Sequence, residues 1–214
     1  MEKLDKMSIP ELWEYILEIY DKQYSGYSSN LNPSAKNEDF ADIEEKMGFA
    51  LPDELKALYF CNNGDRENLE GSILGLRFLP VAEMFLNWCD WLYILRDKEF
   101  MKACEANSES VPQGAIKKVY ANRKWVPFCH DQEGNHIGID LDPDSDGTVG
   151  QIINFGRDED KKYVIANSFK EFMILIINIL DKKKPIIKTK RRRIYVSLDD
   201  CHPIRLFTSN RIDI

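Results

Sequence analysis

The stretch that decides the fold runs from residue 134 to residue 156: Gly-Asn-His-Ile-Gly-Ile-Asp-Leu-Asp-Pro-Asp-Ser-Asp-Gly-Thr-Val-Gly-Gln-Ile-Ile-Asn-Phe-Gly. Two apolar runs flank a turn rich in Gly and Pro, a pattern typical of two paired strands. The same stretch also resembles a metal-binding loop, because Asp140, Asp142, Asp144 and Asp146 alternate before Gly147. The choice between these interpretations decides whether the chain is an ion-binding protein, an enzyme or a protein-binding module.

Calcium binding is the weaker interpretation of these aspartates. A calcium loop beginning at Asp142 needs a bidentate Glu at its twelfth position, and Ile153 stands there. Pro143 stiffens the second position, and the flanking runs have the pattern of strands instead of helices. We therefore expect an acidic turn between two strands, with no metal ligand and no cofactor.

The composition indicates an ordinary globular protein. The chain has 214 residues, of which 43% are hydrophobic, enough for a packed core. Its first residues are charged, and its longest apolar run, 172–180, is too short to cross a bilayer. The five cysteines show no paired spacing, so reduced thiols are expected. These features predict a cytoplasmic protein without a signal peptide or a membrane segment.

The charge is unevenly distributed along the chain. Residues 181–214 contain ten Lys/Arg against four Asp/Glu, a net charge of +6 within a total of −7, which leaves −13 for residues 1–180. An acidic body disfavours direct nucleic-acid binding and favours basic protein partners. The basic run 188–193 is interpreted as a solvated edge that blocks strand pairing.

The periodicity predicts helices first and strands later. Helices are expected from Ser8, from Asn37 to Gly48, from Pro52 to Asn63 and over 81–95, the last either buried on two sides or carrying an exposed apolar patch. A further helix begins after Ser168. The expected strands are 73–79, 117–121, 125–130, 136–140, 150–155 and 163–166. This order predicts an α+β fold: N-terminal helices and a curved, mostly antiparallel sheet of about five to six strands, closed by a C-terminal helix.

The expected domain organisation is simple. Residues 1–184 form a single domain whose residues 1–30 are an N-terminal helical extension. Residues 185–214 form a basic C-terminal extension, a hairpin built from 194–198 and 204–208.

Motifs of catalysis are missing from the sequence. It contains neither GxSxG nor the glycine-rich loops that bind nucleotides. His130, Asp131 and His136 lie near Cys129, but their spacing is not that of a zinc site, and the Cys-His pair at 201–202 is distant in sequence. We therefore predict that the chain is not an enzyme and has no catalytic or metal-binding residue.

Three segments carry a more specific signal. They are, in chain order, Leu51-Pro52 through Asn63-Gly64; Trp125 and Pro127 followed by Asp131, Gly134 and Asn135; and Asp140 with Pro143, Gly147, Gly150, Gln151 and Gly156. Over roughly residues 30–180, the ordered set resembles the SUKH superfamily. That superfamily includes the fungal Smi/Knr regulators of cell-wall glucan synthesis and many bacterial immunity proteins.

The resemblance implies a binding module instead of an enzyme. Its bacterial members bind a cognate toxin, often a nuclease, and block it. The main expectation is therefore an immunity protein that neutralises a basic nuclease toxin; the alternative is a non-catalytic regulatory scaffold of cell-wall (glucan) synthesis or signalling. The expected partner surface consists of acidic residues with aromatic anchors: Asp140, Asp142, Asp144, Asp146, Asp158, Trp88 and Trp91. The identity of the partner and the oligomeric state stay open.

Overall fold

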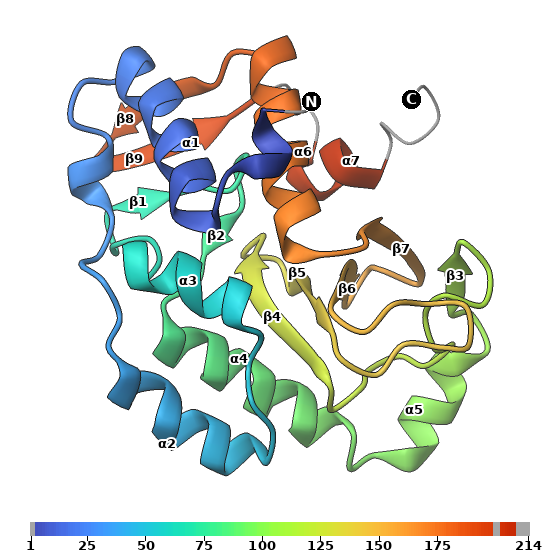
Figure 1. Ribbon diagram of the computed structural model, residues 1–214. Coiled ribbons are helices and arrows are strands. Elements are labelled where there is room, and N and C mark those ends of the chain that lie inside the picture. The colour runs from blue at the N-terminus through green and yellow to red at the C-terminus, as the bar shows by residue number, and fades with distance from the viewer. Residues whose placement is uncertain (1–2, 199–201, 209–214) are drawn as a thin grey trace.

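A mixed, mostly antiparallel sheet forms the centre of the molecule. The computed structural model describes residues 3–198 and 202–208 (Figure 1). Six strands are arranged in the order β2-β4-β5-β6-β7-β3. They are β2 (Arg77–Phe78), β3 (Glu109–Val111), β4 (Trp125–His130), β5 (Asn135–Asp140), β6 (Gln151–Gly156) and β7 (Lys161–Ala166). The α+β prediction is confirmed, as is the pairing of the two apolar runs in 134–156.

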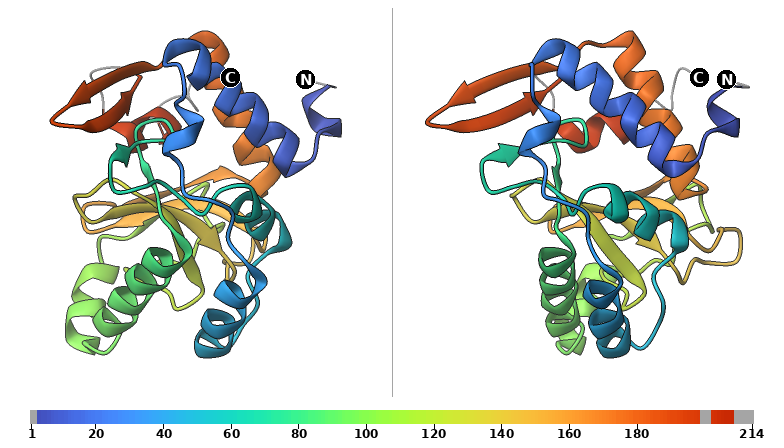
Figure 2. Two further views of the ribbon diagram at one scale, coloured as in Figure 1. Left: turned by 90° about the vertical axis from the view of Figure 1, so that its left-hand side faces the viewer. Right: turned by 60° about the vertical axis from the view of Figure 1, so that its left-hand side comes forward.

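The sheet is covered by helices on both faces, as the views in Figure 2 show. Helices α1 (Ile9–Gln23) and α6 (Phe169–Lys182) lie on one side. Helices α2 (Asn37–Met47), α4 (Val81–Ile94) and α5 (Lys98–Glu105) lie on the other, and α3 (Asp53–Cys61) packs on α1 and α6. Because both faces are buried, β5 and β6 are buried at every residue and lack the alternation of a half-exposed strand.

Two hydrophobic cores follow from this arrangement. The main core joins sheet residues such as Phe128 and Ile139 to α1, α3 and α6. The second lies on the opposite face, where Trp125 and Phe155 meet Trp91 of α4 and Met101 of α5. Neighbouring residues of a strand point to opposite faces, so Ile152 belongs to the first core and Ile153 to the second.

Local signals explain where several helices begin and end. Ser8 and Glu11 form a capping box at the start of α1, with the Ser8 N–H donating to the Glu11 carboxylate at 2.7 Å. The Ser168 hydroxyl accepts the Glu171 N–H at the start of α6. Gly48 ends α2 at φ +77°, a left-handed conformation that glycine adopts without strain.

Two predictions about the middle of the chain were wrong, and one helix was missed. Instead of a strand over 73–79, the chain turns through Leu74 and Gly75 at positive φ before the short strand β2. Residues 117–121 are irregular, because Tyr120 and Ala121 fold over the second core instead of pairing with a strand. Helix α5, whose first turn is capped by the side chain of Asp97, was not predicted.

The C-terminal region also differs from the expectation. Strand β9 (Arg193–Ser197) pairs with β8 (Ile186–Lys190), whereas the second expected strand, 204–208, lies within helix α7 (Pro203–Thr208). Strand β1 (Leu69–Glu70) joins β9 in parallel, giving a three-stranded sheet in the order β1-β9-β8. Buried side chains of β9 and α7 belong to the main core, so this region packs against the rest of the chain.

Two short 3₁₀ helices, Leu4–Lys6 and Ser28–Asn30, flank α1. Within residues 3–198 and 202–208, none of the helices has the length and the apolar character that a membrane crossing requires.

Candidate functional site

The first motif forms a junction between α3, β2 and α4. Pro52 occupies the position just before the first residue of α3, and Leu51 is buried beside it. Gly64 has φ +74°, and a Cβ atom there would lie only 2.7 Å from the carbonyl oxygen of Phe78. The Asn63 side chain accepts the N–H of Val81 at 2.8 Å and so satisfies the first turn of α4. Asn63 and Gly64 therefore have structural roles in this junction.

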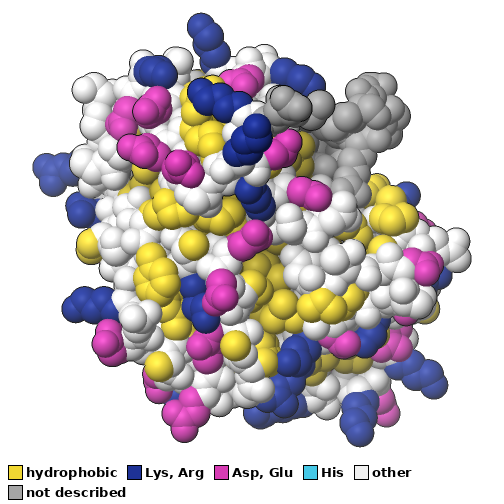
Figure 3. Space-filling model, in the orientation of Figure 1, with side chains coloured by type: hydrophobic (Ala, Val, Ile, Leu, Met, Phe, Trp, Pro, Cys, Tyr) yellow, Lys and Arg dark blue, Asp and Glu magenta, His cyan; other side chains and the backbone are white. Residues whose placement is uncertain are grey.

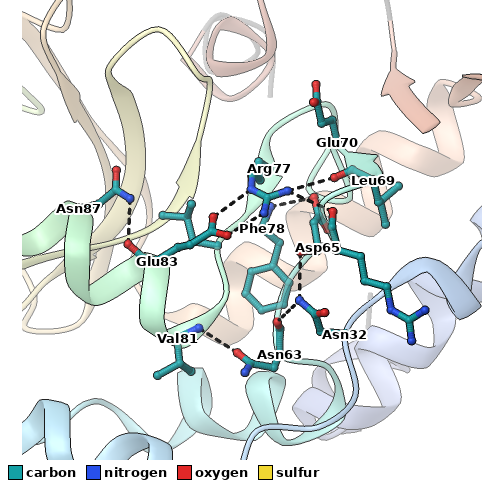
Figure 4. A network of polar contacts seen from close by, with 12 residues as sticks. Asn32, Asn63, Asp65, Leu69, Glu70, Arg77, Phe78, Val81, Glu83 and Asn87 are labelled. Carbon is teal, nitrogen blue, oxygen red and sulfur yellow. Dashed lines mark hydrogen bonds and ion pairs between the residues drawn. The ribbon is translucent and has the colours of Figure 1, made fainter. Parts of the chain in front are cut away.

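Asp65 follows this motif and is completely buried (Figure 4). Its carboxylate accepts backbone N–H groups from Gly71 at 3.2 Å, Ser72 at 3.4 Å and Phe78 at 3.1 Å, and it contacts the Ser72 hydroxyl. Burial raises the pKa of Asp65 to about 7, although these hydrogen bonds favour the charged form. The sequence carries no signal for this residue, because an aspartate that follows Asn-Gly is typical of an ordinary turn.

An arginine connects this junction to α4. Arg77 donates through Nε and Nη2 to both carboxylate oxygens of Glu83, at 3.1 and 2.9 Å, a bidentate geometry (Figure 4). Its Nη1 donates to the carbonyl of Leu69 at 3.2 Å. The Asn32 side chain donates to the carbonyls of Asn63 and Asp65 at 3.0 and 3.1 Å. The network thus joins the segment before α2 to β1, β2 and α4.

The second motif forms the turn between β4 and β5. One carboxylate oxygen of Asp131 accepts the N–H groups of Glu133 at 2.7 Å and Asn135 at 2.9 Å. Gly134 has φ +101°, and the Asn135 side chain accepts the Asp158 N–H at 2.9 Å. Gly156 lies against Asn135 with no room for a side chain. Trp125 and Pro127 are buried in β4, so this motif too is structural.

The residues considered for zinc are only partly brought together. Cys129 lies in the main core, and burial lowers the pKa of His136 to about 3. His202, at the start of α7, places Nε2 3.3 Å from Asp131 and 4.0 Å from Glu133. Asp131, Glu133 and His202 are the set within the described residues whose ligand atoms lie close enough to hold a metal ion. Their contacts also tie α7 to the β4–β5 turn.

The third motif holds the loop between β5 and β6. Asp140 and Gln151 are buried partners: the Gln151 amide donates to the Asp140 carboxylate and to the Ala115 carbonyl, each at 2.9 Å. Its oxygen accepts the Thr148 N–H at 3.1 Å. The same loop includes Pro143, Gly147 and Gly150. Gly147 packs against Ala115 too closely for a side chain, and Gly150 has φ +91°. The Gly and Pro positions therefore serve turn geometry.

The acidic residues of this loop do not converge on one point. Asp142 lies 2.5 Å from the ammonium of Lys117 and accepts the Asn122 amide at 2.9 Å. These contacts lower its pKa, with Lys117 as the largest cause. Asp144 and Asp146 are exposed. The carboxylates thus have separate environments instead of a shared ligand geometry.

The expected partner surface is not a single surface in the structure. Asp140, Trp88 and Trp91 are buried, which corrects their assignment as contact residues. Asp158 is exposed at the opposite end of the β5–β6 hairpin from the aspartate loop, five residue steps or about 17 Å along the strands. Helix α4 instead exposes Leu86 and Tyr93, at 61% and 72%.

A polar hollow of 280 Å³ lies where the segment from β1 to β2 and the β4–β5 turn meet the C-terminal hairpin. Among the residues that the structure describes, its lining offers the ion-pairing and hydrogen-bonding groups of carboxylates, a guanidinium and an imidazole. The lining residues are Glu70, Gly75, Arg77, His130, Asp131, Gln132, Glu133 and Tyr195.

Comparisons with known proteins identify the fold's relatives. A family model described as the SMI1 / KNR4 family (SUKH-1) matches residues 34–174. KNR4/SMI1 homolog 2 of Debaryomyces hansenii is 30% identical over 210 residues, covering 81% of this chain and 36% of that protein. The glucan synthesis regulatory protein of Neurospora crassa is 29% identical and covers 77% of this chain and 37% of its own length.

A further relative is the cell wall assembly regulator SMI1 of Saccharomyces cerevisiae, 26% identical over 79% of this chain and 40% of its own length. The chain therefore spans two fifths or less of these three relatives. The resemblance to the SUKH superfamily is confirmed, and the matched residues include all three motifs. The chain belongs to the SMI1/KNR4 (SUKH-1) family.

Proposed function

We propose that this chain is a non-catalytic regulatory module that acts by binding other proteins, in the control of cell-wall assembly or glucan synthesis. The family match over residues 34–174 carries the proposal, because matching relatives are named as regulators of these processes. The matched part is a domain within longer relatives, as expected for a module whose function depends on what it contacts.

The geometry of the motifs supports a binding module. Gly64 and Gly147 have no space for a side chain, and Asp140 and Gln151 are buried partners of each other. These residues hold loops in place and present no reactive group to solvent. A scaffold of this kind leaves specificity to the exposed residues around it.

Toxin neutralisation is the less supported function. The relatives that match are fungal proteins named as regulators or as KNR4/SMI1 homologues, whereas an immunity protein would be expected to match bacterial antidotes. The acidic charge that favoured a basic toxin is not gathered on the face seen in Figure 3, where acidic and basic side chains are intermixed. The exposed aspartates also lie at opposite ends of one hairpin.

A domain exchange tests the proposal. The matching region of the Saccharomyces cerevisiae regulator is replaced by residues 1–214, and wall glucan content and sensitivity to a cell-wall-binding dye are measured. We expect values closer to the wild type than to a strain lacking the region. The same chimera with Gly64→Ala, which disrupts the junction, serves as the unfolded control.

Two results would contradict the proposal. One is a folded, normally expressed chimera that behaves like the deletion strain. The other is protection of cells against a co-expressed bacterial nuclease toxin by a chain that has no effect on the wall.

A further inference from the structure

The β8–β9 hairpin, residues 186–197, lies outside the region matched by the family model and is called the basic hairpin below. It extends from the body of the molecule, with its turn at the far end (Figure 2). The turn consists of Arg191 and Arg192, and Lys190 and Arg193 flank it. Four positive charges are thus concentrated at one protruding tip.

The strand register places further basic residues on one exposed face. Lys188 is opposite Tyr195, and Lys190 is opposite Arg193, so these four side chains share a face. On the other face, Ile194 and Val196 are buried in the main core. The hairpin is therefore amphipathic, with a basic outer face that contains one aromatic ring.

The outer edge of β8 is open to a partner strand. Strand β8 is the last in the order β1-β9-β8, so within residues 3–198 and 202–208 its second edge has no strand beside it. A hollow adjoins the hairpin: it is lined by Lys188, Thr189 and Lys190 of β8, by Arg191 of the turn and by Tyr195 of β9. Its lining includes Lys188, Lys190 and Tyr195, which share the basic face of the hairpin.

Most basic groups of the hairpin have no ion pair within the described part of the chain. Arg193 pairs with Glu70 at 2.9 Å. Among the residues that the structure describes, Lys188, Lys190, Arg191 and Arg192 have no carboxylate partner. Charge complementarity therefore points to an acidic ligand.

The conformation of the turn supports a role for its arginines. Arg191 and Arg192 have φ +50° and +66°, the left-handed region that a two-residue hairpin turn of this type requires. Asn-Gly adopts this conformation readily, whereas a pair of long side chains is strained in it. Two guanidinium groups are thus placed at the tip where other residues would form a more stable turn.

We propose that the basic hairpin binds an acidic, extended peptide segment of a partner protein, which pairs with the outer edge of β8 and sets its carboxylates against Lys188, Lys190 and the turn arginines. The inference rests on the proposed function, because it specifies the partner chemistry of a protein-binding module. Strand addition at a sheet edge is an established mode of peptide recognition. Nucleic acid is less suitable, because residues 1–180 carry −13 and the face has a single aromatic ring for stacking.

Fluorescence anisotropy with a defined probe tests this inference. The probe is a short fluorescein-labelled peptide in which Glu alternates with Val. We expect the wild type to bind it and Lys188→Thr/Lys190→Thr to weaken binding by about tenfold or more, with high salt weakening it further. Lys98→Gln/Lys102→Gln, which removes two exposed lysines from α5, is the matched control and should bind as the wild type does.

A second variant separates binding from folding. Arg191→Asn/Arg192→Gly removes two charges and introduces the residues that the turn prefers. We expect it to lose about tenfold in affinity while its melting temperature stays at or above that of the wild type. Equal affinity of this variant and the wild type would overturn the role of the turn.

Three further probes complete the test. A peptide with Pro in place of Val keeps the charge but cannot pair with a strand edge, so equal binding would overturn edge pairing. Tighter binding of a single-stranded oligonucleotide, or of phosphatidylserine vesicles, would overturn the choice of a peptide. If a domain-exchange chimera restores the cell wall but the hairpin binds no peptide, only this inference fails; if the hairpin binds and the chimera does not restore the wall, only the proposed function fails.

Discussion

Replacing Asp65 with Asn is expected to change how the stability of the protein depends on pH. Burial raises the pKa of Asp65 from 3.8 to about 7. Between these two values, the folded chain binds a proton that the unfolded chain releases, so the contribution of Asp65 to stability is fully present below about pH 4 and is lost as the pH rises to about 7. A shift of about three units corresponds to about 4 kcal/mol of unfolding free energy.

The structure explains why Asn is a suitable replacement. An Asn side chain can accept the three backbone N–H groups through its oxygen and donate to the Ser72 hydroxyl through its nitrogen. The variant therefore retains the polar contacts but has no charge to bury. We expect it to gain about 4 kcal/mol relative to the wild type between pH 4 and pH 7.

Denaturant unfolding of both proteins across this pH range measures the difference. Asp158→Asn is a control of opposite sign, because the hydrogen bond from Arg157 lowers the pKa of Asp158. The stability of the wild type relative to this variant should therefore rise with pH. A difference between the wild type and Asp65→Asn that is constant with pH would refute the reasoning. The reasoning would also be refuted if the stability of the wild type rose relative to that of Asp65→Asn as the pH rises. That result would mean that the backbone N–H donors lower the pKa of Asp65 by more than burial raises it.

Three further predictions address other parts of the structure. Gly64→Ala should destabilise the protein by more than about 3 kcal/mol, because it adds overlap with backbone to the strain of positive φ, whereas Gly150→Ala, with open space around it, should cost about 1–2 kcal/mol in denaturant unfolding. Burial lowers the pKa of His136 from 6.5 to about 3, so between these two pH values the unfolded chain binds a proton that the folded chain does not. The wild type therefore loses stability as the pH falls from 6.5 to about 3, and His136→Gln should remove this loss. Calcium should leave the melting temperature unchanged, because Asp142 is already paired with Lys117. A clear increase in the melting temperature would instead support calcium binding at residues 140–147.

The main strands and most helices follow from local sequence signals. The capping boxes at Ser8 and Ser168 and the glycine after α2 are contacts between residues a few positions apart. Prediction failed where a segment is shaped by distant contacts. Residues 117–121 have the pattern of a strand, but Tyr120 packs on Trp91 from a different element.

The candidate site was predicted less well than the fold. Trp88 and Trp91 were expected to be aromatic anchors of a partner surface, but both are buried, because α4 packs against the sheet through them. Asp65 had no distinguishing local pattern, because its burial depends on loops that come together only in the folded chain. His202 meets Asp131 across 71 positions of sequence, a contact that spacing rules do not address.

The sequence by itself determined the family, the α+β class and the turn chemistry of residues 134–156, because these depend on periodicity and on residues close in the chain. Only the tertiary structure decided which charges are buried, which are paired and which are open to a partner. Burial and pairing arise between elements far apart in sequence, as the buried Asp140 with Gln151 and the exposed face of the basic hairpin illustrate. The aspartates that first suggested a metal loop are therefore divided by the fold into a buried structural pair, an ion pair with Lys117 and exposed turn residues.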